Sequence, residues 1–232
     1  MKNVDHLMRQ LDIIPIEKLN EPITVIGAGA IGSFVVLSLA KMGFEDITVY
    51  DFDKVSVENM NCQWFRFEDI GKSKVMALGQ LIKAFTKTEI NARDEKFLST
   101  PDQIKSLGKI VITAVDSMAV RKELWACCKD NGKVFWYIDP RMAAEYALCF
   151  VMDPNNTQDI GSYEKTLYTD EKAVEERCTA KATMYTATMI AGYVAKMVKD
   201  IVTKNTEYAR VTHWDIGQNN LQNWSKSINT IK

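Results

Sequence analysis

The chain is predicted to belong to the α/β class, with a mostly parallel sheet flanked by helices and additional antiparallel strands toward the C-terminus. Short β-branched runs alternate with helix-like segments over the first two thirds of the sequence, which is the pattern of βαβ units. A glycine-rich turn follows the first of these runs, Gly27-Ala28-Gly29-Ala30-Ile31-Gly32. The runs at 47–50, 110–115 and 134–138 are each followed by an aspartate. Carboxyl ends of parallel strands form the edge where ligands bind in open α/β sheets, so these observations indicate a Rossmann-like domain.

Length and composition fit a single domain over residues 1–232. The 232 residues are enough for one full core, and the hydrophobic (47%) and charged (25%) fractions are ordinary for a globular protein. A net charge of −1 gives no electrostatic reason to expect nucleic-acid binding. No apolar run approaches the roughly 20 residues that span a membrane, and the charged N-terminus lacks the apolar core of a signal peptide. We therefore expect a cytoplasmic protein without a membrane or nucleic-acid partner.

The cysteines favour reduced thiols. Their number is odd and they are scattered, which argues against a disulfide framework: Cys62, Cys127, Cys128, Cys149 and Cys178. The chain has no CxxC pair and only two histidines, so no zinc site is expected. Cys127 and Cys128 fall on a predicted helix and are interpreted as packing residues.

The first elements follow from apolar spacing and turn residues. Leu7, Leu11 and Ile14 lie at helical spacing, which predicts an N-terminal helix within residues 1–20, with Pro15 ending it or introducing a turn. Apolar spacing predicts further helices after the glycine turn, after Lys74 and after Asp116. A short third strand is expected within residues 89–97.

The pattern changes after residue 146. Residues 146–152 are expected to form a strand outside the alternating series. Polar residues then predict a long surface loop over about 153–177, a length that is uncommon unless the loop is functional or mobile. A buried helix over about 180–202 and a strand-like run at 208–214 precede an Asn- and Gln-rich tail.

The stretch from Ile23 to Gln63 has the order strand, glycine turn, helix, strand and acid, which is typical of a nucleotide-binding unit. The glycines let the backbone approach a phosphate, and the helix from about Ile31 presents free N–H groups to it. Asp51 can accept hydrogen bonds from both ribose hydroxyls. The residues assigned to nucleotide binding here are Gly27, Gly29, Ala30, Ile31, Gly32, Asp51 and Asp53.

Two enzymatic schemes fit such a unit. In an NAD-dependent oxidoreductase, Asp51 would bind the NAD ribose. In an adenylating enzyme it would bind the ATP ribose, and cations and a Mg²⁺ ligand would stabilise charge on the transferring phosphate. The second strand is followed by a polar cluster that an oxidoreductase does not need, comprising Asp51, Asp53, Lys54, Asn59, Asn61, Gln63 and Lys74. With Asp116 after the fourth strand, this cluster favours adenylation.

The same residues resemble the ThiF/MoeB/HesA superfamily, the adenylyltransferases related to ubiquitin-activating enzymes. The resemblance is carried by Gly27–Gly32, Asp51-Phe52-Asp53-Lys54-Val55, Asn59-Met60-Asn61-Cys62-Gln63, Gly71-Lys72-Ser73-Lys74 and Val115-Asp116-Ser117 with Arg121. It implies ATP-dependent adenylation of a C-terminal carboxylate, typically that of a ubiquitin-like protein, a sulfur-carrier protein or a peptide.

The resemblance also implies roles for single residues. Asp51 would hold the ribose, Lys74 and Asn59 the triphosphate, and Asp116 the Mg²⁺ ion. Arg9 falls where the family has an arginine that reaches the ATP of the partner subunit, which implies a symmetric homodimer. Simpler interpretations stay open, with Lys74 as a solvated helix lysine, Asp116 as a plain helix N-cap and Arg9 as a surface residue.

One residue departs from the family pattern. The family's Asn-Arg-Gln has Cys62 in place of its arginine, and that arginine would stabilise charge on the phosphate. Arg66 is a candidate to reach the same space. Loss of the arginine leaves a non-catalytic, partner-binding subunit as an alternative function, although Arg9, Lys74 and Asp116 are retained.

Cys178 is the candidate nucleophile for a thioester step after adenylation. The following helix and Arg177 would lower the pKa of its thiol, whereas Glu175 and Glu176 would raise it. Some members of the family use a cysteine in this region and others stop at the adenylate. A structural thiol remains the alternative.

Overall fold

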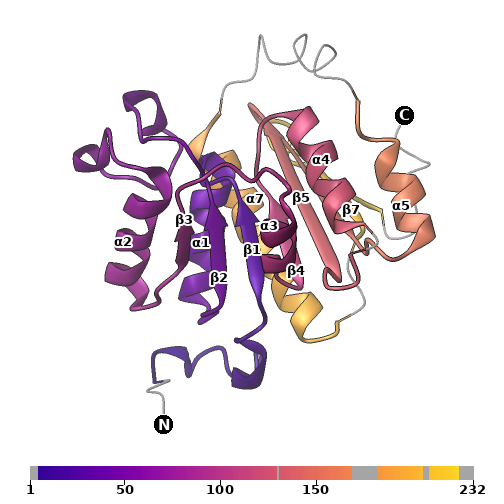
Figure 1. The fold of residues 1–232 in the computed structure, drawn as a ribbon, viewed down its shortest axis with the longest axis horizontal. Coiled ribbons are helices and arrows are strands. Elements are labelled where there is room, and N and C mark those ends of the chain that lie inside the picture. The colour runs from indigo at the N-terminus through magenta and orange to yellow at the C-terminus, as the bar shows by residue number, and fades with distance from the viewer. Residues whose placement is uncertain (1–4, 130, 169–181, 206–208, 225–232) are drawn as a thin grey trace.

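The computed structural model describes residues 5–129, 131–168, 182–205 and 209–224. Within these ranges eight strands form one sheet in the order β3-β2-β1-β4-β5-β6-β7-β8 (Figure 1). The strands are β1 (Ile23–Ile26), β2 (Ile47–Tyr50), β3 (Asn91–Arg93), β4 (Ile110–Thr113), β5 (Trp136–Ala143), β6 (Tyr146–Met152), β7 (Val211–Asp215) and β8 (Asn220–Trp224). The α-helices are α1 (Ala30–Lys41), α2 (Lys74–Thr86), α3 (Pro101–Ser106), α4 (Met118–Cys128), α5 (Thr157–Glu164) and α7 (Met184–Val202).

The first five strands are parallel and the last three are antiparallel, which confirms the predicted fold class. β1 lies between β2 and β4, and the chain crosses from one side of β1 to the other between β3 and β4. This reversal is the topological switch point at which ligands bind in such sheets. The glycine turn after β1 and the loop after β4 therefore flank the expected site.

β5 extends beyond its parallel neighbour. It pairs with β4 only from Trp136 to Ile138, whereas its antiparallel pairing with β6 continues to Ala143. The sequence predicted a strand ending before Asp139, but Asp139 lies inside β5, opposite Phe150 of β6. It is therefore located where the parallel part of the sheet stops and the antiparallel part continues.

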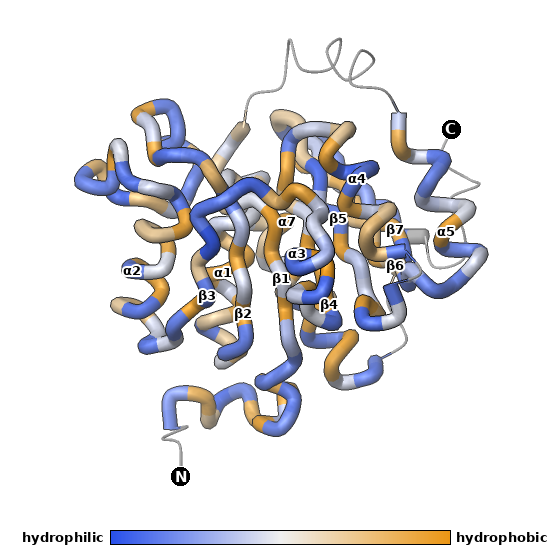
Figure 2. Tube along the Cα trace, viewed as in Figure 1, coloured by the Kyte–Doolittle hydropathy of each residue, from blue (hydrophilic) through white to orange (hydrophobic). Residues whose placement is uncertain are grey.

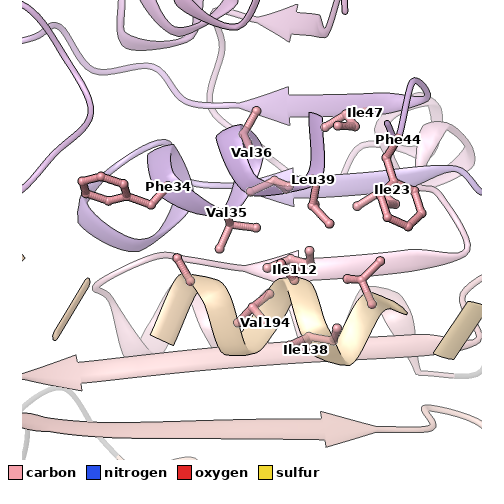
Figure 3. Packing of buried hydrophobic residues seen from close by; sticks show 14 of the residues in the cluster. Ile23, Phe34, Val35, Val36, Leu39, Phe44, Ile47, Ile112, Ile138 and Val194 are labelled. Carbon is pink, nitrogen blue, oxygen red and sulfur yellow. The ribbon is translucent and has the colours of Figure 1, made fainter. Parts of the chain in front are cut away.

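Two buried clusters cover the two faces of the sheet. α1 and α7 pack on one face, where Val35 and Leu39 of α1 and Val194 of α7 meet Ile112 and Ile138 of the strands (Figure 3). On the other face, Leu124 and Trp125 of α4 and Tyr163 of α5 pack against Tyr137 of β5. Apolar residues are concentrated in the strands and on the inner faces of the helices (Figure 2). In the described part of the chain, no helix combines the length and the apolarity needed to cross a membrane.

The predicted helix within residues 1–20 is wrong for residues 5–20. Two single 3₁₀ turns, Asp5–Leu7 and Ile16–Lys18, flank irregular turns. Residues 5–20 pack beside the C-terminal end of α1, where Gln10 Nε2 donates to the carbonyl of Met42 at 2.5 Å. A segment this short is only marginally stable as an isolated helix. Its contacts with the end of α1 therefore determine the conformation of residues 5–20.

The expected loop over 153–177 contains a helix, α5, over Thr157–Glu164. Asn156 caps it by accepting hydrogen bonds from the amides of Gln158 and Asp159, a start signal that the sequence contains. The Asn- and Gln-rich tail also differs from expectation, because residues 220–224 form β8 against β7. The predicted strand at 146–152 is confirmed as β6.

Candidate nucleotide-binding site

The glycine turn after β1 packs tightly against the loop after β4 and against the first turn of α1. Gly27 has a φ of 97°, and a Cβ there would lie 2.4 Å from the carbonyl oxygen of Ala114. A Cβ on Gly32 would lie 1.9 Å from the carbonyl oxygen of Gly27. Only glycine therefore permits the first turn of α1, the end of β1 and the loop after β4 to approach so closely.

Gly29 differs from these two glycines because no atom lies within 4 Å of the Cβ position it would have. It is the N-cap residue of α1, a position without a side-chain hydrogen bond. The space beside it is open, so a phosphate can approach the N–H groups of the first helical turn. This geometry supports the assignment of Gly29, Ala30 and Ile31 to phosphate binding.

Asp51 follows β2 and is oriented by two backbone amides. Its Oδ2 accepts from the amide of Ala28 at 2.7 Å, and its Oδ1 accepts from the amide of Asp53 at 2.8 Å. Each carboxylate oxygen can accept a second hydrogen bond, so the side chain can still accept hydrogen bonds from two ribose hydroxyls. The contact also joins the glycine turn to the polar segment after β2.

Lys74 is the first residue of α2, and its side chain is only 8% exposed. Its Nζ forms an ion pair with Asp53 at 2.9 Å, and its backbone amide donates to the carbonyl of Asp53. The Asp53 carboxylate is about half exposed. A solvated helix lysine is therefore excluded, because this ammonium is buried with one carboxylate partner on the solvent side. Two of its three donors have no hydrogen bond within the described residues.

Asn59 belongs to a short 3₁₀ turn in the same segment. Its Oδ1 accepts from the amide of Ser56 at 2.9 Å in a reciprocal capping arrangement. The turn is anchored to α1, since the amide of Trp64 donates to Ser33 Oγ and the Trp64 ring packs against Phe34. Ser33 and Trp64 were not singled out from the sequence. Their role depends on a contact between segments 31 residues apart.

Cys62 follows the 3₁₀ turn Val57–Asn59 and is buried. Burial raises the pKa of its thiol, and the Lys74 charge opposes that rise. A thiol with a raised pKa is neutral near pH 7, so Cys62 does not supply the charge of the arginine that it replaces. Arg66 does not replace the missing arginine here, because its guanidinium is bidentate to Asp69 at 2.9 Å and also pairs with Glu68.

Asp116 follows β4 on the exposed side of the loop. Ser117, the next residue, is the N-cap of α4, and its Oγ accepts from the amide of Val120. In the described ranges, no group of three or more His, Cys, Asp or Glu side chains could hold a metal alone. One carboxylate nevertheless fits Mg²⁺, which typically binds one or two carboxylates together with substrate phosphates and water.

One predicted site residue, Arg9, is not brought into this cluster. Arg9 is exposed beside the C-terminal end of α1, whereas the glycine turn adjoins its N-terminal end. A helix of 12 residues is about 18 Å long, so Arg9 is remote from the site of its own chain. Cys178 lies outside the described residues. The helix that was expected from about residue 180 is α7, which begins at Met184.

The fold and the cluster define an α/β domain with a candidate nucleotide-binding site at the switch point, where Asp51 binds the glycine turn and Asp53, and Asp53 pairs with the buried Lys74. A family model described as "ThiF family" matches residues 16–230, and the chain belongs to this family.

Similar proteins include enzymes of several kinds. The chain is 34% identical over 114 residues to a tRNA threonylcarbamoyladenosine dehydratase of Haemophilus influenzae, covering 47% of this chain and 43% of that protein. It is 32% identical over 102 residues to a NEDD8-activating enzyme E1 catalytic subunit of Dictyostelium discoideum, covering 43% and 23%. The matches thus span less than half of each relative. The solved structure of E. coli MccB with AMPCPP and MccA has a TM-score of 0.80 at 15% identity, covering 99% of this chain and 74% of that one. This likeness shows the fold.

We predict that Lys74→Met lowers the affinity for ATP or the rate of its turnover by roughly 100-fold, the usual scale for removing one preorganised donor. The fold should persist, because Asp53 is half exposed and is not left as an unpaired buried charge. Nucleotide binding and ATP–pyrophosphate exchange, together with the thermal unfolding midpoint, measure the two effects. Lys72→Met is the matched control, since Lys72 is exposed and pairs with Asp69. Equal losses in both variants would contradict the assignment.

Proposed function

We propose that this chain adenylates the C-terminal carboxylate of a ubiquitin-like or sulfur-carrier protein, or of a peptide, at the expense of ATP. The buried Lys74 ammonium carries the proposal: it pairs with Asp53, whose amide binds the same Asp51 carboxylate that binds the glycine turn. An oxidoreductase has no need for a buried cation at the place where a nucleotide triphosphate would extend. The family assignment and the names of the relatives point the same way.

In the proposed reaction a carboxylate oxygen of the substrate attacks the α-phosphorus of ATP. A new P–O bond forms, the bond to the bridging oxygen of pyrophosphate breaks, and the bonding pair leaves with pyrophosphate. The product is an acyl adenylate. Asp51 orients the ribose, the first turn of α1 and Lys74 stabilise the phosphate charges, and Asn59 positions the triphosphate through its side-chain amide.

Asp116 would hold Mg²⁺ in this scheme. The ion, when bound, neutralises charge on the phosphate oxygens. The chain supplies one carboxylate on the loop after β4, which touches the glycine turn through Ala114. Asp51 supports this scheme from the other loop that contacts the glycine turn, since its carboxylate binds the amide of Ala28.

Asp116→Ala should abolish ATP–pyrophosphate exchange, with a loss of roughly 100-fold or more expected when the charge on the phosphates is not neutralised. Exchange is measured with a set of candidate proteins and peptides that have free C-termini, including Gly-Gly tails. Glu123→Ala, an exposed acid on α4, is the control and should keep full activity. The proposal fails if the unmodified chain shows no exchange with any candidate while its ATP binding is insensitive to Asp116→Ala.

A non-catalytic partner-binding subunit is the second candidate function, and Cys62 favours it. Neither Cys62 nor the fully paired Arg66 supplies the cation that the family arginine would provide. Partner binding without pyrophosphate release is its distinguishing result. The retained Lys74, Asp51 and Asp116 support the catalytic function instead.

We also propose a homodimer in which Arg9 of each chain completes the site of the other. Support comes from the position of Arg9, which is exposed at the end of α1 opposite the glycine turn. An arginine so placed can act on a triphosphate only in a second copy. A two-fold arrangement makes both sites equivalent.

Mixing two inactive variants tests the exchange of Arg9 between chains. Arg9→Ala and Lys74→Met should each lose activity alone, and unfolding and refolding them together should restore part of it. Mixed dimers restore one site, because one chain supplies an intact Lys74 site and the other an intact Arg9. The control mixes Lys74→Met with a Lys74→Met, Arg9→Ala double variant. No recovery in the first mixture would contradict the proposed arrangement.

The thioester step is a separate proposal that rests on Cys178. After adenylation, the thiolate would attack the acyl carbon and AMP would leave. Intact-mass measurement should then show a thiol-sensitive conjugate that is absent in Cys178→Ala and present in Cys127→Ala. If the conjugate persists in Cys178→Ala, the acylated thiol is a different cysteine. If an adenylate forms without any conjugate, the reaction stops after adenylation and the thioester proposal is wrong.

A further inference from the structure

Asp139 is the shared acceptor in a buried network of charged and polar side chains. Its side chain is fully buried, and its carboxylate accepts hydrogen bonds from Arg121 Nε, Arg141 Nε and Tyr163 Oη, each at 2.7 Å. Burial would raise the pKa of Asp139, but the two guanidinium groups outweigh it and hold the pKa below its ordinary value. Burial and the neighbouring Asp139 raise the pKa of Tyr163. The network therefore consists of one carboxylate, two cations and a neutral phenol.

The two arginines reach different places. Arg121, on α4, also donates from Nη2 to the carbonyl oxygen of Val115 at 2.5 Å. Val115 immediately precedes Asp116, so this contact fixes the loop that carries the candidate metal ligand. Arg141, on β5, donates instead to the carbonyl and hydroxyl of Thr166 after α5.

We propose that Asp139 and Arg121 are positioning residues for Asp116: the carboxylate holds the guanidinium, and the guanidinium holds the Val115 carbonyl. The inference rests on the proposed function for the role of Asp116. The claim that Arg121 makes the loop of Val115 rigid does not depend on the proposed function. A planar guanidinium can donate to Asp139 and to Val115 at once from fixed positions, whereas a lysine ammonium at the same place lacks that fork.

Groups that orient metal ligands typically change metal affinity by about 10- to 100-fold when removed. Arg121→Lys should therefore raise the Mg²⁺ concentration that half-saturates binding of fluorescent ATP by about tenfold, with little change in nucleotide affinity without Mg²⁺. In the absence of nucleotide, amide hydrogen exchange should accelerate at Val120, whose amide donates to Ser117 in the same loop.

Arg141→Lys is the matched control, because Arg141 is similarly buried and binds the same carboxylate. It should leave the Mg²⁺ requirement within about twofold and exchange at Val120 unchanged. Similar losses of thermal stability in the two variants are expected, so stability alone does not separate them. Asp139→Asn should reproduce the effects of Arg121→Lys. If Arg121→Lys fails to fold, Arg121→Gln replaces it.

Equal effects of Arg121→Lys and Arg141→Lys on the loop, or unchanged exchange at Val120 in Arg121→Lys, would overturn the proposal. Failure of the proposed function gives a different result. In that case the unmodified chain shows no Mg²⁺-dependent ATP binding, while hydrogen exchange without nucleotide still decides whether Arg121 holds the loop.

Discussion

The candidate nucleotide-binding site at the parallel half of the sheet depends on the two hydrogen bonds that Asp51 accepts. One comes from Ala28 in the glycine turn and the other from Asp53 at the start of the polar segment. Gly27 in the same turn is packed against the carbonyl of Ala114. The loop after β1 is therefore in contact with the loops after β2 and β4 through backbone and carboxylate atoms. Their relative positions are fixed before any nucleotide binds, which is the preorganisation that electrostatic catalysis requires.

Cys62 changes the balance of charge around this unit. In its buried position a thiol adds no charge, because burial raises its pKa. Lys74 then has a neutral neighbour and one exposed carboxylate partner, so its ammonium has less competition for an incoming phosphate than it would have inside a closed ion-pair network. This arrangement is compatible with catalysis by fewer cations than the family pattern provides. It is equally compatible with tight nucleotide binding and slow chemistry, and exchange kinetics distinguish the two.

The parallel half of the fold could be predicted from the sequence because local patterns agree there. The glycine turn, the apolar runs and the terminal aspartates all indicate the same βαβ order, and Asp51 and Lys74 lie in the predicted cluster. The predictions that were wrong, for the N-terminal segment and the C-terminal tail, share a different cause: both conformations depend on contacts with distant parts of the chain. The N-terminal segment is shaped by Gln10 and Leu7 docking on the end of α1, and β8 exists only by pairing with β7. α5 is the exception, since its cap at Asn156 is a local signal that the sequence contains.

Asp139 illustrates what no local pattern reveals. It was expected at the end of a strand, but β5 continues, and the extension places Asp139 and Arg141 two residues apart on one face of the sheet. A buried charge network of this kind is costly, and apolar residues of similar volume often stabilise a core better. Packing alone therefore does not account for it. Leucine and methionine could fill the same space, but they could not hold the carbonyls of Val115 and Thr166, which lie in different loops. The charges are explained by the need to fix those loops, and the loop of Val115 is the one that ends in Asp116.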